Sequence, residues 1–266
     1  PPDLSSDHRA RCQPGPRPMP MPPPPPLRTT SPPELWCAAI NKAVEHACTR
    51  RRTGNQTSPR HESCARAHRV FRRRRGPAVA EGAAVRLNIA GQSCGWPSRM
   101  LVPKELHDKA VEIAAKTANA TVVGLPQDEN TQVGPLSNAA QFNKVQSMIE
   151  EAIRQGTHLS AGGLGRPAGL EKGFFAKPTV FSNVSNDMMI AQEEVFGPVL
   201  AIIPYNDEED AIKIANDSSY GLAGYVQSGN LKRARSVAKK LRAGTIFLNG
   251  NNYDANAPFG GYKQSG

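Results

Sequence analysis

A single cysteine lies in a glycine-rich turn, and a strongly patterned sequence follows it. Cys94 stands in Gly91-Gln92-Ser93-Cys94-Gly95, and no other cysteine comes after it. Between such a turn and a following helix, backbone N–H groups could stabilise a thiolate and make this residue a nucleophile. A lone cysteine is also a common inert core residue, and both interpretations fit the spacing alone.

The histidines of the patterned region are predicted to lie away from this turn. His107 falls on a predicted helix and His158 in a predicted strand. A cysteine protease-like pair needs the histidine within hydrogen-bond reach of the thiol. The sequence therefore gives little support to a Cys–His pair.

The elements that must position Cys94 alternate along the chain after about residue 81. Apolar spacing and turn signals predict helices over residues 83–90, 103–119, 138–155, 207–216 and 231–241. Short apolar runs predict strands over residues 121–124, 157–160, 179–181, 198–204, 222–226 and 244–248. Strands that alternate with helices indicate an α/β fold with a mostly parallel open sheet.

The first 80 residues have a different composition. They hold 15 of the 33 Lys and Arg residues but only 5 of the 23 Asp and Glu residues, so residues 81–266 hold 18 of each. They also hold 15 of the 24 prolines and four of the five cysteines. The excess positive charge is thus confined to a Pro/Arg-rich segment, residues 1–80, and the domain is predicted to occupy residues 81–266.

Several interpretations of residues 1–80 stay open. The tract 14–26 predicts polyproline II or disorder, or a ligand for a proline-binding domain. Arginine clusters at 50–52 and 72–75 attract phosphates and could bind a nucleic acid. Aromatic residues that could stack on bases are not interleaved with these arginines, which gives nucleic-acid binding little support. Cys48, His61, Cys64 and His68 lack the paired spacing of a zinc site, so no metal is predicted. The composition also fits a segment of a GC-rich gene that has been translated out of frame.

Apolar runs are too short for a membrane span, and the chain does not start with a signal peptide. We therefore expect a cytoplasmic protein with reduced thiols and no membrane partner.

A family resemblance adds to this interpretation of the residues. Gly91-Gln-Ser-Cys94 with Ser98-Arg99 resembles the cysteine motif of the aldehyde dehydrogenase superfamily. Further family-like motifs follow in the family's order over residues 82–266: Gly124-Leu-Pro126, Gly134-Pro135, Gln141, Gly173-Phe-Phe with Pro178-Thr179, Glu193-Glu-Val-Phe-Gly-Pro198, Asn216-Asp217 with Tyr220-Gly-Leu222, Gly244 with Asn249, and Pro258-Phe-Gly-Gly-Tyr-Lys with Ser265-Gly266.

The resemblance implies a role for five residues. Cys94 would attack an aldehyde, its backbone N–H would hold the thiohemiacetal oxyanion, and hydride would pass to NAD or NADP. Glu194 would grip the ribose on the nicotinamide side, Phe196 would bound the nicotinamide pocket, and Gln141 would contact a cofactor ribose. Phe259 would line the substrate tunnel. The partner would be a small-molecule aldehyde, and the full-length family implies a homo-oligomer.

The chain also departs from the family pattern. The general-base glutamate of the family lies in a Glu-Leu-Gly-Gly-Lys-like segment, and neither Glu62 nor Glu81 has that context. Residues 1–80 contain no glycine-rich phosphate loop after a strand. We therefore expect a truncated, inactive fragment of such an enzyme, in which oligomer formation is doubtful. The alternative is a catalytically dead interaction or nucleic-acid-binding module that uses the basic segment.

Overall fold

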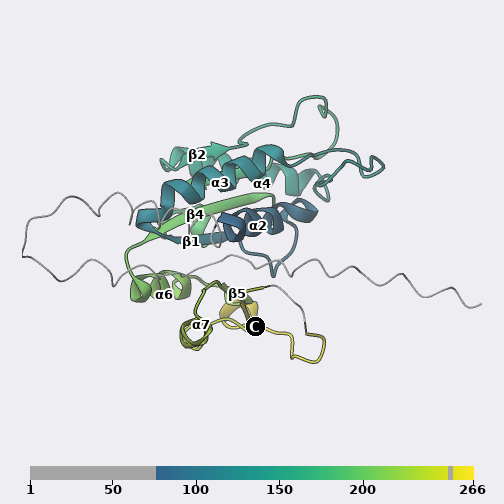
Figure 1. Ribbon diagram of the computed structural model, residues 1–266. Helices are drawn as coiled ribbons and strands as arrows, with labels where there is room; N and C mark the ends of the chain where they lie inside the picture. Colours follow the sequence, from purple (N-terminus) through teal and green to yellow (C-terminus); the bar gives the residue numbers. More distant parts are fainter. Residues whose placement is uncertain (1–75, 251–253) are drawn as a thin grey trace, which may run out of the picture. The chain divides into compact units, whose positions relative to one another are not determined.

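A computed structural model of the chain describes residues 76–250 and 254–266. The proline tract, the arginine clusters, the four candidate zinc ligands and Glu62 lie outside these residues. The described elements are drawn in Figure 1: α2 (Gly76–Leu87), η2 (Asn88–Gly91), β1 (Arg99–Pro103), η3 (Lys104–Leu106), α3 (His107–Ala120), α4 (Ala139–Arg154), β2 (His158–Ala161), β3 (Thr179–Ser182), α5 (Met189–Gln192), β4 (Val199–Tyr205), α6 (Glu208–Asn216), β5 (Ala223–Val226), α7 (Leu231–Ala238), β6 (Thr245–Leu248) and η4 (Lys263–Ser265).

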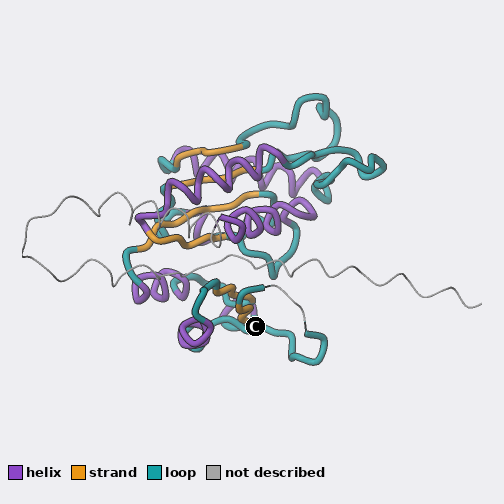
Figure 2. Tube along the Cα trace, viewed as in Figure 1, coloured by secondary structure: helices purple, strands orange, loops and turns teal. Residues whose placement is uncertain are grey.

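The main sheet has the strand order β1-β4-β3-β2. β4 pairs in parallel with both β1 and β3, whereas β2 joins the edge at β3 in the antiparallel direction. β5 and β6 form a separate parallel pair. Figure 2 shows the strands in orange among helices in purple. The expected α/β fold with a mostly parallel sheet is confirmed.

The side chains of β4 alternate between two apolar clusters, one on each face of the main sheet. Ala201 and Ile203 belong to a cluster that includes the apolar face of α4. Leu200 and Ile202 belong to a second cluster, with apolar residues of α2 and α3. Strands buried on both faces read as continuous apolar runs, which is why residues 198–204 lack alternation.

Local signals set several helix ends. The Asn138 side chain accepts a hydrogen bond from the Gln141 N–H and caps α4, and Asp207 caps α6 in the same way. These caps satisfy N–H groups that have no partner inside the helix. The helices predicted after residues 138 and 207 therefore begin where the sequence indicates.

The structure corrects three local predictions. Residues 121–124 form no strand, because only an isolated bridge joins Val123 to Val133. The helix predicted to residue 241 ends at Ala238. The segment directly after the Cys94 turn is strand β1, and the next α-helix begins only at His107. β1 exists because it pairs with β4, a hundred residues later in the chain, so local sequence gives little sign of it.

None of the helices in the described part of the chain is long and apolar enough to cross a membrane.

Candidate active site

Cys94 lies in an exposed turn between η2 and β1, with a free thiol. The turn is closed by the Trp96 N–H, which donates to the Ser93 carbonyl at 3.3 Å. Within the described residues, no hydrogen bond occupies the Cys94 backbone N–H. Because β1 follows the turn, no helix begins directly after the thiol, and that prediction was wrong. The turn itself leaves Cys94 exposed.

The residues before Cys94 are fixed against two other segments. The Gln92 side-chain oxygen accepts a hydrogen bond from the Ser137 N–H at 2.9 Å. Gly91 has φ +69°, and a Cβ there would lie 2.0 Å from the Gly197 carbonyl oxygen. Only glycine allows both this backbone conformation and this close approach. The glycine of the cysteine motif thus packs directly on the loop that contains Glu194.

After Cys94 the chain is held by Tyr225 and Arg99. The Tyr225 hydroxyl donates to the Gly95 carbonyl at 2.5 Å. The Arg99 guanidinium donates to the carbonyls of Ile214 and Ala215 at the end of α6, at 3.1 and 3.0 Å. A cation at this position also complements the negative end of the helix dipole. The Ser98-Arg99 part of the motif therefore anchors the start of β1.

The loop that carries Glu194 is clamped by side chains of α4. The Gln141 amide nitrogen donates to the carbonyls of Val195 and Phe196, at 3.0 and 2.8 Å. Lys144 Nζ donates to the Glu194 carbonyl at 2.8 Å. Phe196 adopts φ 49°, a left-handed conformation that is unusual for a bulky residue. Three consecutive carbonyls thus turn toward α4, and the Glu194 side chain is left exposed.

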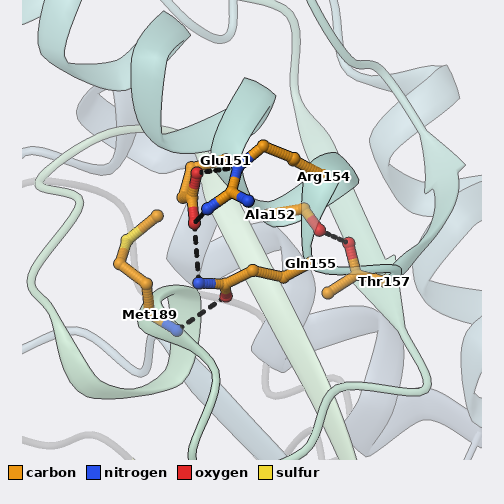
Figure 3. A network of polar contacts seen from close by, with 6 residues as sticks. All are labelled: Glu151, Ala152, Arg154, Gln155, Thr157 and Met189. Carbon is orange, nitrogen blue, oxygen red and sulfur yellow. Dashed lines mark hydrogen bonds and ion pairs between the residues drawn. The ribbon is translucent and has the colours of Figure 1, made fainter.

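The other end of α4 fixes α5, which leads into this loop. Figure 3 shows Gln155 between the Glu151 carboxylate and the Met189 backbone. The Gln155 amide nitrogen donates to Glu151 at 2.8 Å, and its oxygen accepts from the Met189 N–H at 2.9 Å. α4 therefore holds the segment before Glu194 as well as the residues that follow it.

A buried arginine that the sequence interpretation missed completes this frame. Arg86 of α2 is 2% exposed, and it donates to the carbonyls of Gly197 and Val199 at 2.7 and 2.8 Å. Burial lowers the pKa of Arg86 to about 10, and the nearby Glu194 carboxylate opposes that effect. The one signal in the sequence was a charged residue inside the apolar run 83–90.

The motif at the end of the sequence packs against the end of α6. Lys263 Nζ donates to the carbonyls of Asn216 and Ser218, at 2.6 and 2.7 Å. Burial lowers the pKa of Lys263, and the charges of Arg242 and Arg99 add to that effect. These contacts bring the segment that contains Phe259 toward the Cys94 turn.

A cavity of about 460 Å³ collects three of the five predicted site residues. Cys94, Glu194 and Phe259 line it, together with Trp96 and Tyr225. Phe259 is 72% exposed, so its ring forms an open rim rather than a buried wall. Phe196 and Gln141 are not among the lining residues, although Gln141 fixes the loop that bears Glu194. A larger, mostly apolar hollow of about 850 Å³ lies between α2 and α3 and contains none of the five.

Other chemistry finds little support in the described residues. His107 is buried and receives a hydrogen bond from the Asn183 N–H at 3.4 Å, and neither it nor His158 lines the cavity. Glu81 lies on α2 outside the cavity, where burial raises its pKa. No group of three or more His, Cys, Asp or Glu side chains in residues 76–250 and 254–266 is arranged to hold a metal ion.

Comparisons with known proteins show related sequences and related structures. A 3-succinoylsemialdehyde-pyridine dehydrogenase of Pseudomonas sp is 54% identical over 189 residues, which make up 71% of this chain and 40% of that protein. The structure resembles a cysteine-to-alanine mutant of aldehyde dehydrogenase C from Pseudomonas syringae in complex with NAD+ and octanal, with 47% identity and a TM-score of 0.70 over 71% of this chain and 39% of that one. It also resembles an aldehyde dehydrogenase of Mycobacterium tuberculosis in complex with NAD+, with 46% identity and a TM-score of 0.68 over 69% and 38% of the two chains.

The chain spans about two fifths of the length of the curated relatives it matches. The model of the aldehyde dehydrogenase family matches residues 76–266, which begin at the first residue of α2 and include the cysteine turn, the Glu194 loop and the final motif. This chain therefore belongs to the aldehyde dehydrogenase family.

Proposed function

We propose that this chain carries the cysteine-bearing catalytic part of an NAD(P)+-dependent aldehyde dehydrogenase, with Cys94 as the nucleophile. The observation that carries the proposal is the shared cavity of Cys94, Glu194 and Phe259, which come from three distant parts of the sequence. A nucleophile, a carboxylate and an aromatic rim in one cavity suit a small organic substrate beside a polar cofactor.

Cys94 begins the reaction as a thiolate. Its Sγ attacks the carbonyl carbon of the aldehyde, a C–S bond forms, and the carbonyl π electrons move onto oxygen as the thiohemiacetal oxyanion. The Cys94 N–H, which no hydrogen bond occupies within the described residues, is available to stabilise that oxygen. Gly91 packs against Gly197 on one side of the turn, and the Gly95 carbonyl accepts a hydrogen bond from Tyr225 on the other, so both contacts limit how far this N–H can move.

The Glu194 loop fits the ribose and nicotinamide part of NAD(P)+. Glu194 presents an exposed carboxylate into the cavity, and the backbone carrying it is clamped by Lys144 and Gln141. A carboxylate that is held in place accepts hydrogen bonds from neighbouring hydroxyl groups well. Glu194 would hold the ribose of NAD(P)+ here, and the bound cofactor would supply the hydride acceptor needed to oxidise the thiohemiacetal to a thioester.

We assign Phe196 and Gln141 to the support of this cofactor position. The half-buried Phe196 would bound the nicotinamide pocket, and Gln141 would hold the backbone of Val195 and Phe196 while its side-chain oxygen contacts a ribose. NAD+ is the cofactor to test first, because it is present in the two related structures.

Hydrolysis of the thioester requires a base that activates water. In the described part of the chain, two carboxylates line the cavity, those of Glu193 and Glu194, and Glu81 lies outside it. We assign Glu194 to cofactor binding, and neither residue lies in a Glu-Leu-Gly-Gly-Lys-like segment. Hydride transfer also needs a positioned dinucleotide, and residues 1–80 contain no glycine-rich phosphate-binding motif. The complete oxidation is therefore proposed for the whole enzyme, and the 266-residue chain alone is expected to stop at capture of the aldehyde.

Aldehyde capture by Cys94 can be tested without a cofactor. The full chain is incubated with octanal, the aldehyde present in a related structure, then treated with iodoacetamide, and alkylation is followed at each cysteine by mass spectrometry. We expect octanal to slow alkylation of Cys94, which lines the cavity and is assigned as the nucleophile. Cys12, Cys37, Cys48 and Cys64 serve as internal references, and their alkylation should not change.

Octan-1-ol is the matched control, because it has the same alkyl chain but no carbonyl group. Protection by octanal alone supports covalent capture. Equal protection by both compounds, or none by either, contradicts the assignment of Cys94 as nucleophile.

A further inference from the structure

Tyr225 reaches the Cys94 turn from a strand outside the main sheet. Its hydroxyl donates to the Gly95 carbonyl, 130 positions earlier in the chain, at 2.5 Å. The Tyr225 side chain belongs to β5 and is buried, and it lines the same cavity as Cys94. A buried tyrosine hydroxyl usually has a partner, and here the partner is the main chain next to the candidate nucleophile.

The position of this phenol is determined by β6 as well as by β5. Tyr225 and Phe247 are paired residues in the parallel β5–β6 ladder. Their rings stack with centroids 4.9 Å apart and an interplanar angle of 19°. The strand pairing and the ring stacking together restrict the Tyr225 side chain, so its hydroxyl stays within hydrogen-bond distance of the Gly95 carbonyl.

The Cys94 turn has little other support around Gly95. The Trp96 N–H closes it through a 3.3 Å hydrogen bond to Ser93, which is long for an amide donor. A Cβ at Gly95 would meet no atom within 4 Å, so packing does not fix this residue. Among the described side chains, only Tyr225 donates to a carbonyl of residues 93–97.

We propose that Tyr225 is a positioning residue: its hydroxyl holds the Gly95 carbonyl and so orients Cys94 Sγ and the Cys94 N–H together toward one reacting carbonyl. This inference rests on the proposed role of Cys94. The Gly95 carbonyl belongs to the Gly95–Trp96 peptide, so holding it fixes the turn on the C-terminal side of Cys94 and limits movement of the backbone that carries both the sulfur and the N–H. Both groups must face the same carbonyl for attack and oxyanion stabilisation to occur together.

The phenol keeps its proton under the conditions in which a cysteine reacts. Burial raises the pKa of Tyr225 to about 12, well above the ordinary thiol pKa of about 8.5. The hydroxyl thus remains a donor to Gly95 at neutral and moderately alkaline pH.

Two reactions of Cys94 separate orientation from simple reactivity. In the first, the thiolate attacks the carbonyl of p-nitrophenyl acetate, a C–S bond forms, the bond to p-nitrophenolate breaks, and the released phenolate is measured as a burst. This reaction passes through an oxyanion. In the second, the thiolate displaces iodide from iodoacetamide, and no oxyanion forms.

The experiment compares the full chain with Tyr225→Phe and with Tyr262→Phe, and each burst is corrected with the same chain carrying Cys94→Ser. Tyr262 is 54% exposed and does not line the cavity, so its variant is the control for loss of a hydroxyl. We expect Tyr225→Phe to slow the acylation burst about tenfold, the worth of about one hydrogen bond. Alkylation of Cys94, resolved by mass spectrometry, should change less than about twofold, since it needs no oxyanion.

The possible outcomes separate the two proposals. An unchanged burst in Tyr225→Phe, or an equal slowing of both reactions, overturns the positioning role. A burst that persists in full in the Cys94→Ser chain overturns the proposed nucleophile, whatever Tyr225 does. Should Tyr225→Phe not fold, Phe247→Leu keeps the hydroxyl but removes the stack, and a burst as fast as that of the unmodified chain contradicts the inference.

Discussion

Arg86 offers a demanding test of how the site is held together. Its guanidinium is buried and donates to two buried main-chain carbonyls, those of Gly197 and Val199. The perturbation we consider is Arg86→Met, which keeps an unbranched side chain but removes every donor. Because both acceptors are main-chain groups, the substitution leaves them without their donor, and no second substitution can remove them.

The expected size of the effect follows from two opposing contributions. A hydrogen bond from a charged donor contributes about 1.5–3 kcal/mol, so losing two costs roughly 3–6 kcal/mol. Removing the buried charge also removes the free-energy cost of its desolvation, which offsets part of this loss. Burial lowers the pKa of Arg86 from 12.5 to about 10, which corresponds to about 3 kcal/mol. The two contributions leave a net loss of up to about 3 kcal/mol in the free energy of unfolding, and we expect about 2.

Urea unfolding followed by circular dichroism measures this loss. With a slope of about 1–3 kcal/mol per molar urea, a change of about 2 kcal/mol moves the midpoint by roughly 1 M. Arg154→Met is the control, because the Arg154 side chain is 73% exposed and pairs with Glu151 on the helix surface. A surface pair contributes at most about 1 kcal/mol, so that midpoint should barely move.

Arg86→Lys separates charge from geometry. Lysine keeps a positive charge but lacks the planar fork that reaches two acceptors at once. We therefore expect a midpoint below that of the unmodified chain. A midpoint for Arg86→Met equal to or above that of the unmodified chain would refute the reasoning, since it would mean that the cost of burying the charge exceeds the value of its two hydrogen bonds.

Three further predictions follow from the geometry of the site. Gly91→Ala should lower the free energy of unfolding by at least about 2 kcal/mol, because its Cβ would lie 2.0 Å from the Gly197 carbonyl oxygen. Gly95→Ala is the control and should unfold at nearly the urea midpoint of the unmodified chain, because a Cβ there would meet no atom within 4 Å. Burial raises the pKa of Tyr225 from 10 to about 12, so the stability that depends on its neutral phenol is complete below pH 10 and is lost as pH rises to 12; urea midpoints for Tyr225→Phe should lack this decline. The 266-residue chain with octanal and NAD+ should form no more NADH, followed by absorbance, than its Cys94→Ser variant. Hydride transfer needs a positioned dinucleotide, and residues 1–80 contain no glycine-rich phosphate-binding motif to hold one. Robust Cys94-dependent NADH formation would contradict this.

The sequence predicted the elements that depend on local pattern. The apolar spacing of residues 138–155 predicted α4, and the continuous apolar run at residues 198–204 predicted β4. The ordered motifs also indicated the family and drew attention to Cys94, Glu194 and Phe259, which line one cavity. Side-chain periodicity and short motifs are properties of neighbouring residues, so one sequence is enough to show them.

Contacts between distant segments could not be predicted in this way. β1 is a strand because residues 99–103 pair with residues 201–205 of β4. Arg86 reads as a charged residue in an apolar helix until its partners at Gly197 and Val199 are known. The same is true of Gln141, which resembled only a cofactor contact but also clamps the Glu194 loop.

The sequence by itself therefore indicated the residues to which we assign the chemistry, and the tertiary structure decided what holds them in place. The acceptors in this frame are main-chain carbonyls, including those of Gly95, Val195, Phe196 and Gly197. Every residue has such a carbonyl, so nothing in the amino-acid types marks the ones that will be used. Only the folded chain, by bringing β5, α4 and α2 against the two loops, selects them.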